Sequence, residues 1–88
     1  MDGPGTASLV SVCPLAALSA QDSGTIVSLQ GGRGFVSRLA ALGFIPGARL
    51  TVVQNYGHGP LIVLIRQTRV ALGRNEANRI LVQKEAQQ

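Results

Sequence analysis

Short aliphatic segments, separated by glycine and proline, fill the sequence between Thr25 and Val82. None is long enough for a buried helix, and each is rich in the branched residues that favour β-strands. The segments predict five strands, at Thr25–Gln30, Leu50–Asn55, Leu61–Ile65, Val70–Leu72 and Arg79–Gln83. The third is apolar throughout, which predicts a central strand buried on both faces. The polar residues 66–69 predict a tight connection that pairs the third and fourth strands as a hairpin.

One segment follows the period of a helix instead. Phe35, Leu39 and Leu42 recur at i, i+4 and i+7, which predicts an amphipathic helix of about ten residues that begins at Arg33. Leu39 and Leu42 are expected in the core. The glycine at Gly43 favours a left-handed cap that ends the helix.

Two single turns of helix are also expected. One lies in the leucine-containing stretch Pro14–Gly24 and leads into the first strand. The other is capped by Asn75 and extends through Asn78.

With 88 residues, the chain has room for one domain. Five short strands and one helix after the first strand predict a mainly β fold, a small SH3-like barrel whose closure protects the strand edges. An OB-like barrel is the nearest alternative, although that fold usually carries its helix late in the chain. Residues 13–83 are assigned to the barrel, residues 1–12 to a flexible N-terminal tail and residues 84–88 to a C-terminal tail.

The charge of the chain favours an anionic partner. Eight basic residues stand against four acidic ones, a net charge of +4. Nucleic acid, acidic lipid and an acidic protein face all satisfy this charge, and so does a simple role in solubility. Tyr56 is the one aromatic residue that could stack on a base among the arginines, which disfavours a platform for single-stranded nucleic acid.

No catalytic constellation is present in the sequence. His58 is the single histidine and Cys13 the single cysteine, and no pair of carboxylates serves acid–base chemistry, so an enzyme is not expected. No firm cofactor is expected either, because metal ligands do not recur at short spacing. The loop Gly57-His58-Gly59 would at most give His58 a weak or intermolecular contact with Fe(II) or another divalent transition metal.

The simplest location is the cytoplasm. A lone cysteine suits a reducing compartment, and no apolar stretch of about 20 residues could span a bilayer. The N-terminus lacks the basic start of a secretory signal.

Three separated motifs resemble those of the FeoA family. The run Arg38–Leu50, R-L-A-A-L-G-F-I-P-G-A-R-L, is similar to the family pattern of an Arg-Leu pair, a Leu-Gly pair and a Pro-Gly turn. Gly59-Pro60 and the strand after it are similar to a family loop and strand. The run Val70–Ile80 is similar to the family ending, with Gly73 where an arginine is frequent. The resemblance covers about residues 14–83.

This resemblance implies an SH3-like barrel and a cytoplasmic accessory of ferrous-iron uptake, which docks on the membrane GTPase that transports Fe(II). The chain would then sit at the inner membrane through its partner, with no small-molecule substrate. The same domain ends metal-dependent repressors, but no helix-turn-helix precedes it here, so a stand-alone domain is expected. A nucleic-acid-binding barrel and a transition-metal-binding regulatory domain stay as alternatives, and the docking face and oligomeric state stay open. The residues expected to contact the partner are Arg38, Leu42, Phe44, Pro46, Tyr56 and His58.

Overall fold

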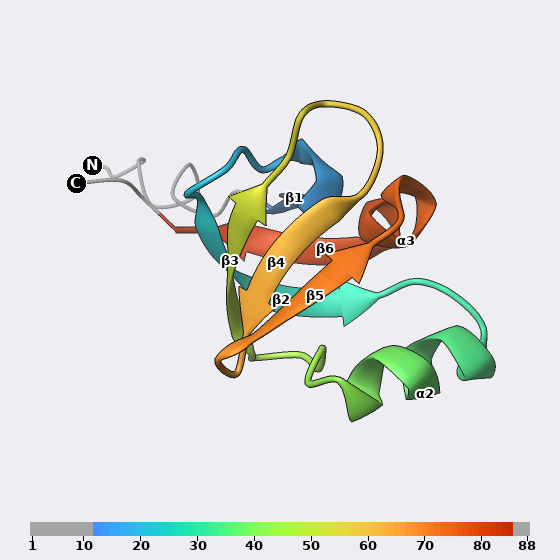
Figure 1. Cartoon of the computed structure of the whole chain (residues 1–88). Helices are drawn as coiled ribbons and strands as arrows, with labels where there is room; N and C mark the ends of the chain where they lie inside the picture. Colours follow the sequence, from blue (N-terminus) through green and yellow to red (C-terminus); the bar gives the residue numbers. More distant parts are fainter. Residues whose placement is uncertain (1–11, 86–88) are drawn as a thin grey trace, which may run out of the picture.

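Six strands and three short helical segments make up the fold in a computed structural model that describes residues 12–85 (Figure 1). In chain order the elements are β1 (Val12–Pro14), the 3-10 turn η1 (Leu15–Ala17), β2 (Ser23–Leu29), α2 (Arg33–Ala41), β3 (Arg49–Gln54), β4 (Leu61–Ile65), β5 (Thr68–Leu72), α3 (Arg74–Asn78) and β6 (Ile80–Lys84). The mainly β prediction is confirmed, with β1 as a sixth strand that was not expected. Most of the two predicted tails lies outside the described residues, while Val12 begins β1 and Lys84 ends β6.

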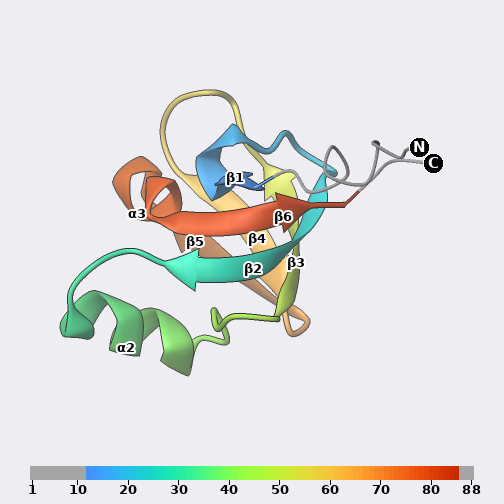
Figure 2. The ribbon, with the colours of Figure 1, turned by 180° about the vertical axis from the view of Figure 1, so that it is seen from behind.

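All strand pairs are antiparallel, in the order β1-β6-β2-β3-β4-β5. The register shifts at Val27 on β2 and at Val53 on β3, where the strand carries an extra residue against its partner. Such bulges bend a strand and increase its twist. The sheet accordingly curls around its core instead of lying flat (Figures 1 and 2).

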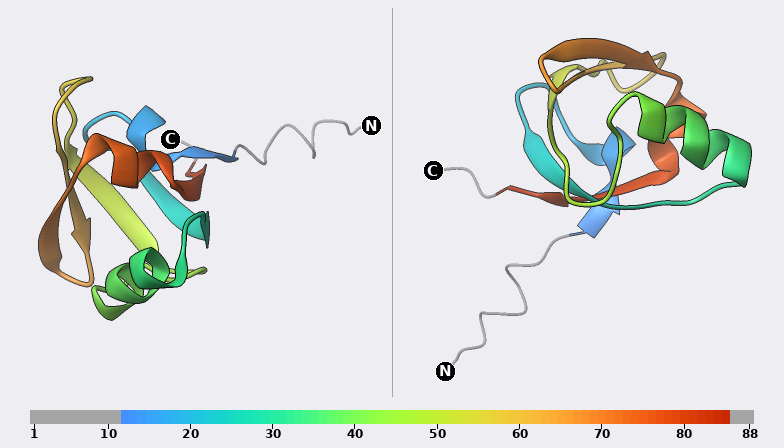
Figure 3. Two further views of the ribbon diagram at one scale, coloured as in Figure 1. Left: turned by 90° about the vertical axis from the view of Figure 1, so that its right-hand side faces the viewer. Right: turned by 90° about the horizontal axis from the view of Figure 1, so that it is seen from below.

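The curl does not remove every edge, contrary to the sequence prediction. Among residues 12–85 the strand order ends at β1 on one side and β5 on the other. The turn η1 and the helix α3 contact each other. These two helical segments follow the end strands β1 and β5. They lie next to the strand edges that a fully closed barrel would join by backbone hydrogen bonds (Figure 3).

The core lies inside the curl and consists of aliphatic side chains and one phenylalanine. Residues alternate along the strands, so that Leu50 and Val52 of β3 point inward, as do Ile80 and Val82 of β6. The fully buried side chains are Leu15, Leu18, Ile26, Leu39, Phe44, Leu50, Val52, Leu61, Val63, Ile65, Leu72, Ala77, Ile80 and Val82.

The prediction that β4 is buried on both faces was wrong. Leu61, Val63 and Ile65 are buried, but Leu64 on the opposite face is 39% exposed. A curled sheet has one concave face to fill, and α2 lies at an end of the sheet, so it leaves the outer face of β4 uncovered (Figures 1 and 3).

Two local predictions also need correction. The β4–β5 hairpin turns through two residues, Arg66 and Gln67, whose φ values are 52° and 65°, so the expected connection of four residues was too long. The N-cap of α3 is Gly73, not Asn75, because the Glu76 carboxylate accepts a hydrogen bond from the Gly73 amide at 3.0 Å.

Candidate functional site

The sequence-predicted partner contacts lie at two opposite ends of the sheet. β3 starts after the α2 segment and ends at the loop 55–60, and β4 returns from that loop. Leu42 and Pro46 therefore lie at the end beside α2, while Tyr56 and His58 lie at the other end (Figures 1 and 2). A strand of this length separates the two groups by roughly 15–20 Å. One compact docking site that contains all the predicted residues is not formed.

At the α2 end, the burial of the side chains corrects two expectations, a core position for Leu42 and a surface contact for Phe44. Leu42 is 44% exposed, so its assignment to the core was wrong, while Leu39 is buried as predicted. Phe44 is fully buried and offers no surface to a partner. The reason is Gly43, whose φ of 103° reverses the chain at the end of α2 and turns Phe44 inward.

Arg38 joins α2 to α3. Its guanidinium forms an ion pair with Glu76 and lies 5.9 Å from the centre of the Phe35 ring. The guanidinium of Arg79 lies 5.6 Å from the same ring centre. The side chain of Arg38 remains 59% exposed, so it holds the two helices together and still presents charge to solvent.

At the other end, the side chain of Asn55 anchors the loop 55–60. Its amide nitrogen donates hydrogen bonds to the backbone oxygens of Ala16, at 3.1 Å, and Leu18, at 2.6 Å. Its amide oxygen accepts from the Gly57 amide and from a guanidinium nitrogen of Arg74, each at 2.9 Å. Both donors and both acceptors of this side chain are thus used: one bond stabilises the loop itself, and three tie it to η1, the residue after η1, and α3.

Arg74 completes this anchor. Its Nε donates to the backbone oxygen of Gly59 at 3.2 Å, so one guanidinium bridges the start and the end of the loop. The tip of the loop is left outside, with Tyr56 72% exposed and His58 also exposed. The sequence reasoning missed both anchors. The Asn-x-Gly spacing of Asn55 and Gly57 is typical of an Asx turn and was the available signal.

We expect Asn55→Ala to lower the free energy of unfolding by about 2–3 kcal/mol, because four hydrogen bonds are lost and one of them is charged. Amide hydrogen exchange in residues 56–60 should become faster than in the rest of the sheet. The matched control is Asn78→Ala, which alters an exposed asparagine in α3. Equal losses in the two variants would show that the anchor does not hold the loop.

The described part of the chain contains no cluster of metal-ligating side chains. No group of three or more His, Cys, Asp or Glu side chains within residues 12–85 could hold a metal ion. The contact of His58 with a divalent metal stays a prediction. No helix within residues 12–85 is both long enough and apolar enough to span a lipid bilayer.

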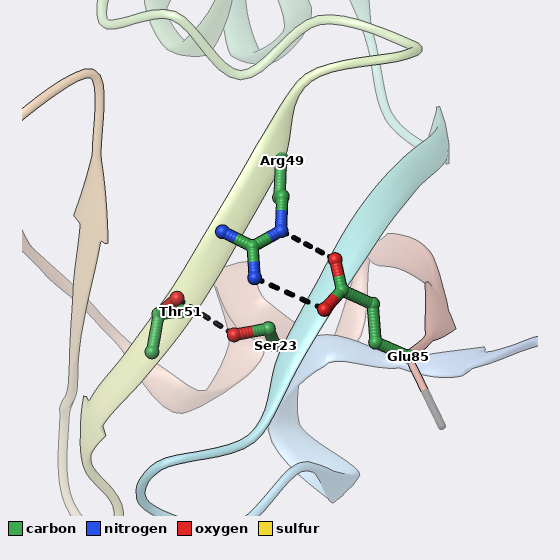
Figure 4. A network of polar contacts seen from close by, with 4 residues as sticks. All are labelled: Ser23, Arg49, Thr51 and Glu85. Carbon is green, nitrogen blue, oxygen red and sulfur yellow. Dashed lines mark hydrogen bonds and ion pairs between the residues drawn. The ribbon is translucent and has the colours of Figure 1, made fainter. Parts of the chain in front are cut away.

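The outer face of β2 and β3 carries a polar network (Figure 4). Arg49 makes two hydrogen bonds to the Glu85 carboxylate, one of them at 3.0 Å, and the Ser23 and Thr51 hydroxyls lie 2.8 Å apart beside it. The hydrogen bonds from Arg49 lower the pKa of Glu85, and its positive charge acts in the same direction. This network ties Glu85, the residue after β6, to Arg49 of β3. The polar side chains on this part of the outer face therefore bind one another.

Comparison with known proteins identifies relatives over nearly the whole fold. The FeoA domain family matches residues 13–84. A crystal structure of an iron uptake regulatory protein, FeoA, is 32% identical with a TM-score of 0.81, covering 85% of this chain and 100% of that chain. Stenotrophomonas maltophilia FeoA, described as a prokaryotic SH3-domain protein and complexed with zinc, is 32% identical with a TM-score of 0.70, covering 81% and 93%.

A further relative shows the same fold inside a longer protein. A manganese-dependent transcriptional repressor is 25% identical with a TM-score of 0.78, covering 84% of this chain and 41% of that chain. No curated protein matches the sequence. Together with the strand order, these likenesses confirm the predicted SH3-like fold.

Proposed function

The chain belongs to the FeoA family, and from this premise we propose that it is an accessory protein of ferrous-iron uptake that docks on the membrane GTPase transporting Fe(II). The observation that carries the proposal is the family match over residues 13–84. The match includes all six strands and, of their residues, leaves out only Val12, the first residue of β1. FeoA proteins are a transport-related accessory family, linked to ferrous iron and not a known family of enzymes. A protein contact is therefore the expected mode of action.

The proposal places the chain in the cytoplasm, held at the inner membrane by its partner. Exposed side chains are available for docking at both ends of the sheet. Leu42 and Pro46 are exposed at the α2 end, and Tyr56 and His58 at the loop end. Arg38 adds an exposed charge between α2 and α3. Phe44 would support the docking surface only from beneath.

The test is binding of the full chain to the Fe(II)-transporting GTPase of the same organism, reconstituted in lipid nanodiscs and measured by biolayer interferometry at physiological salt. We expect saturable binding, and we expect Fe(II) uptake to fall in a strain that lacks this gene and to recover with the wild-type copy. Empty nanodiscs of the same lipid are the control, because they report any direct membrane binding of a basic protein. Normal uptake in the deletion strain together with no binding above empty nanodiscs would overturn the proposal.

A further inference from the structure

A half-exposed apolar surface lies where the chain leaves α2. Leu42 is 44% exposed and Ile45 is 42% exposed, and Pro46 after them is exposed too. Between them Gly43 and Phe44 are buried, so the chain passes inward and out again and leaves the two aliphatic side chains outside. With Arg66, these residues are called the α2-end patch: Leu42, Ile45, Pro46 and Arg66.

Arg66 belongs to this patch because its side chain lies over Gly43. A Cβ atom built on Gly43 would come within 2.7 Å of the Arg66 Cδ, so the Arg66 side chain packs directly on this glycine, whose φ of 103° disfavours any residue with a Cβ. The tip of the β4–β5 hairpin thereby places a guanidinium-bearing side chain beside the residue that separates Leu42 from Phe44. This proximity brings together segments more than twenty positions apart in the sequence.

Arg66 also stands where arginine is not the favoured residue. A two-residue hairpin with positive φ at both positions usually carries Asn-Gly or a similar pair. Arg66 and Gln67 instead adopt φ values of 52° and 65°, which are unfavourable for residues with a Cβ. Backbone strain of this kind is concentrated at functional positions.

The charge of Arg66 is not neutralised within the described chain. Residues 12–85 contain three acidic residues, and each forms an ion pair with a basic side chain. The ion pairs are Asp22–Lys84, Glu76–Arg38 and Glu85–Arg49. Within the same residues neither Arg66 nor its neighbour Arg69 is part of an ion pair. Arg69 lies opposite the exposed Leu64 on the outer face of β4 and β5, so a cation next to an aliphatic side chain recurs beside the patch.

We propose that the α2-end patch docks an acidic amphipathic segment of a protein partner, whose carboxylates bind Arg66 while its apolar side chains cover Leu42 and Ile45. Guanidinium groups bind carboxylates in a planar, bidentate way, and aliphatic side chains beside them exclude water from that contact. That a protein partner exists rests on the proposed function. The patch proposal adds which surface of the chain the partner binds and by what chemistry.

An acidic segment fits this patch better than a membrane does. Binding to anionic lipid grows with the number of basic residues that face one plane, and the patch itself supplies one arginine. Two exposed aliphatic side chains on the segment against which Arg66 packs instead match one turn of an amphipathic helix, with two apolar residues and one carboxylate.

The test uses the full-length, ¹⁵N-labelled chain and a designed helical peptide with leucine on one face and glutamate beside it. Amide shifts should change in residues 40–48 and 64–69 and not in the loop 55–60. The same peptide with lysine in place of glutamate should cause no such shifts, and vesicles of phosphatidylcholine and phosphatidylserine should cause none either. Shifts centred on the loop 55–60, equal effects of both peptides, or stronger effects of the vesicles would each overturn the patch proposal.

Matched variants separate the patch from general surface effects. Arg66→Gln should weaken peptide binding by at least roughly tenfold, and Leu42→Ser or Ile45→Ser by about the same factor. Val12→Ser is the control for the apolar changes, since Val12 is 46% exposed in β1. Arg33→Gln is the control for the charge change, because Arg33 has no ion pair within residues 12–85. Equal losses in the controls would overturn the proposal.

The two proposals fail separately. If the GTPase in nanodiscs binds the wild-type chain and the Arg66→Gln and Leu42→Ser variants equally well, the patch proposal is wrong while the proposed function stands. If the acidic peptide binds the patch, but the GTPase does not bind the chain and the deletion strain takes up Fe(II) normally, the proposed function is wrong while the chemistry of the patch stands.

Discussion

Phe44→Ala is expected to lower the free energy of unfolding by about 3–5 kcal/mol, the largest effect of any single change considered. Phe44 is completely buried and is the largest side chain in the core. Its removal takes a ring out of a small core and leaves a cavity that the curled sheet can close only in part. A domain of this size has a total stability of about 4–13 kcal/mol, so the variant should lose a large fraction of it.

Urea unfolding followed by far-ultraviolet circular dichroism measures this loss as a shift of the midpoint. Phe44→Leu is the control, because it keeps most of the buried apolar volume and should lose about 1–2 kcal/mol. A loss below about 1 kcal/mol for Phe44→Ala would mean that Phe44 does not lie in the core. Partner binding by folded Phe44→Leu should be close to wild type, which separates its structural role from a direct contact.

Most strands could be predicted from the sequence because their signals are local. β4 has the predicted bounds, Leu61–Ile65, since Pro60 precedes it and a polar turn follows it. α2 begins at the predicted Arg33 and gives way to the glycine cap at Gly43, whose φ is positive as its position required. In both cases glycine or proline marks a boundary that tertiary contacts need not define.

The features that were missed depend on contacts between distant residues. β1 has three residues, and its pairing with β6 joins Val12 to Gln83, far apart in the sequence. A strand so short has no periodicity of its own to detect. The outward position of Leu64 has a similar cause, because a continuous apolar run does not reveal which face of a sheet stays uncovered.

The candidate site was the least predictable part for the same reason. The sequence grouped Leu42 and Pro46 with Tyr56 and His58, whereas β3 and β4 hold the two pairs at opposite ends (Figure 1). The sequence placed Arg66 in a polar connection and among the arginines of a candidate nucleic-acid-binding face. Its place over Gly43 follows from the β4–β5 hairpin, which no local pattern links to the end of α2. Partner contact by any of these residues remains a prediction.

Leu39→Ala is expected to lower the free energy of unfolding by about 2–5 kcal/mol, whereas Leu42→Ala should change it by at most about 0.5 kcal/mol. The two leucines are three positions apart at the end of one helix, and the sequence predicted a core position for both. Leu39 is 1% exposed and Leu42 is 44% exposed. Because the substitution is the same, the difference reports burial and not helix propensity.

The two variants are compared by urea unfolding under identical conditions, with equal m-values as evidence that neither alters the unfolded state. Equal losses would place Leu42 back in the core and would remove it from the α2-end patch. If Leu42→Ala is stable, it can be used in the binding experiments as a folded variant that lacks one apolar side chain of the α2-end patch. Loss of partner binding without loss of stability would then assign Leu42 to docking, because the buried Leu39 shows what loss of core packing does.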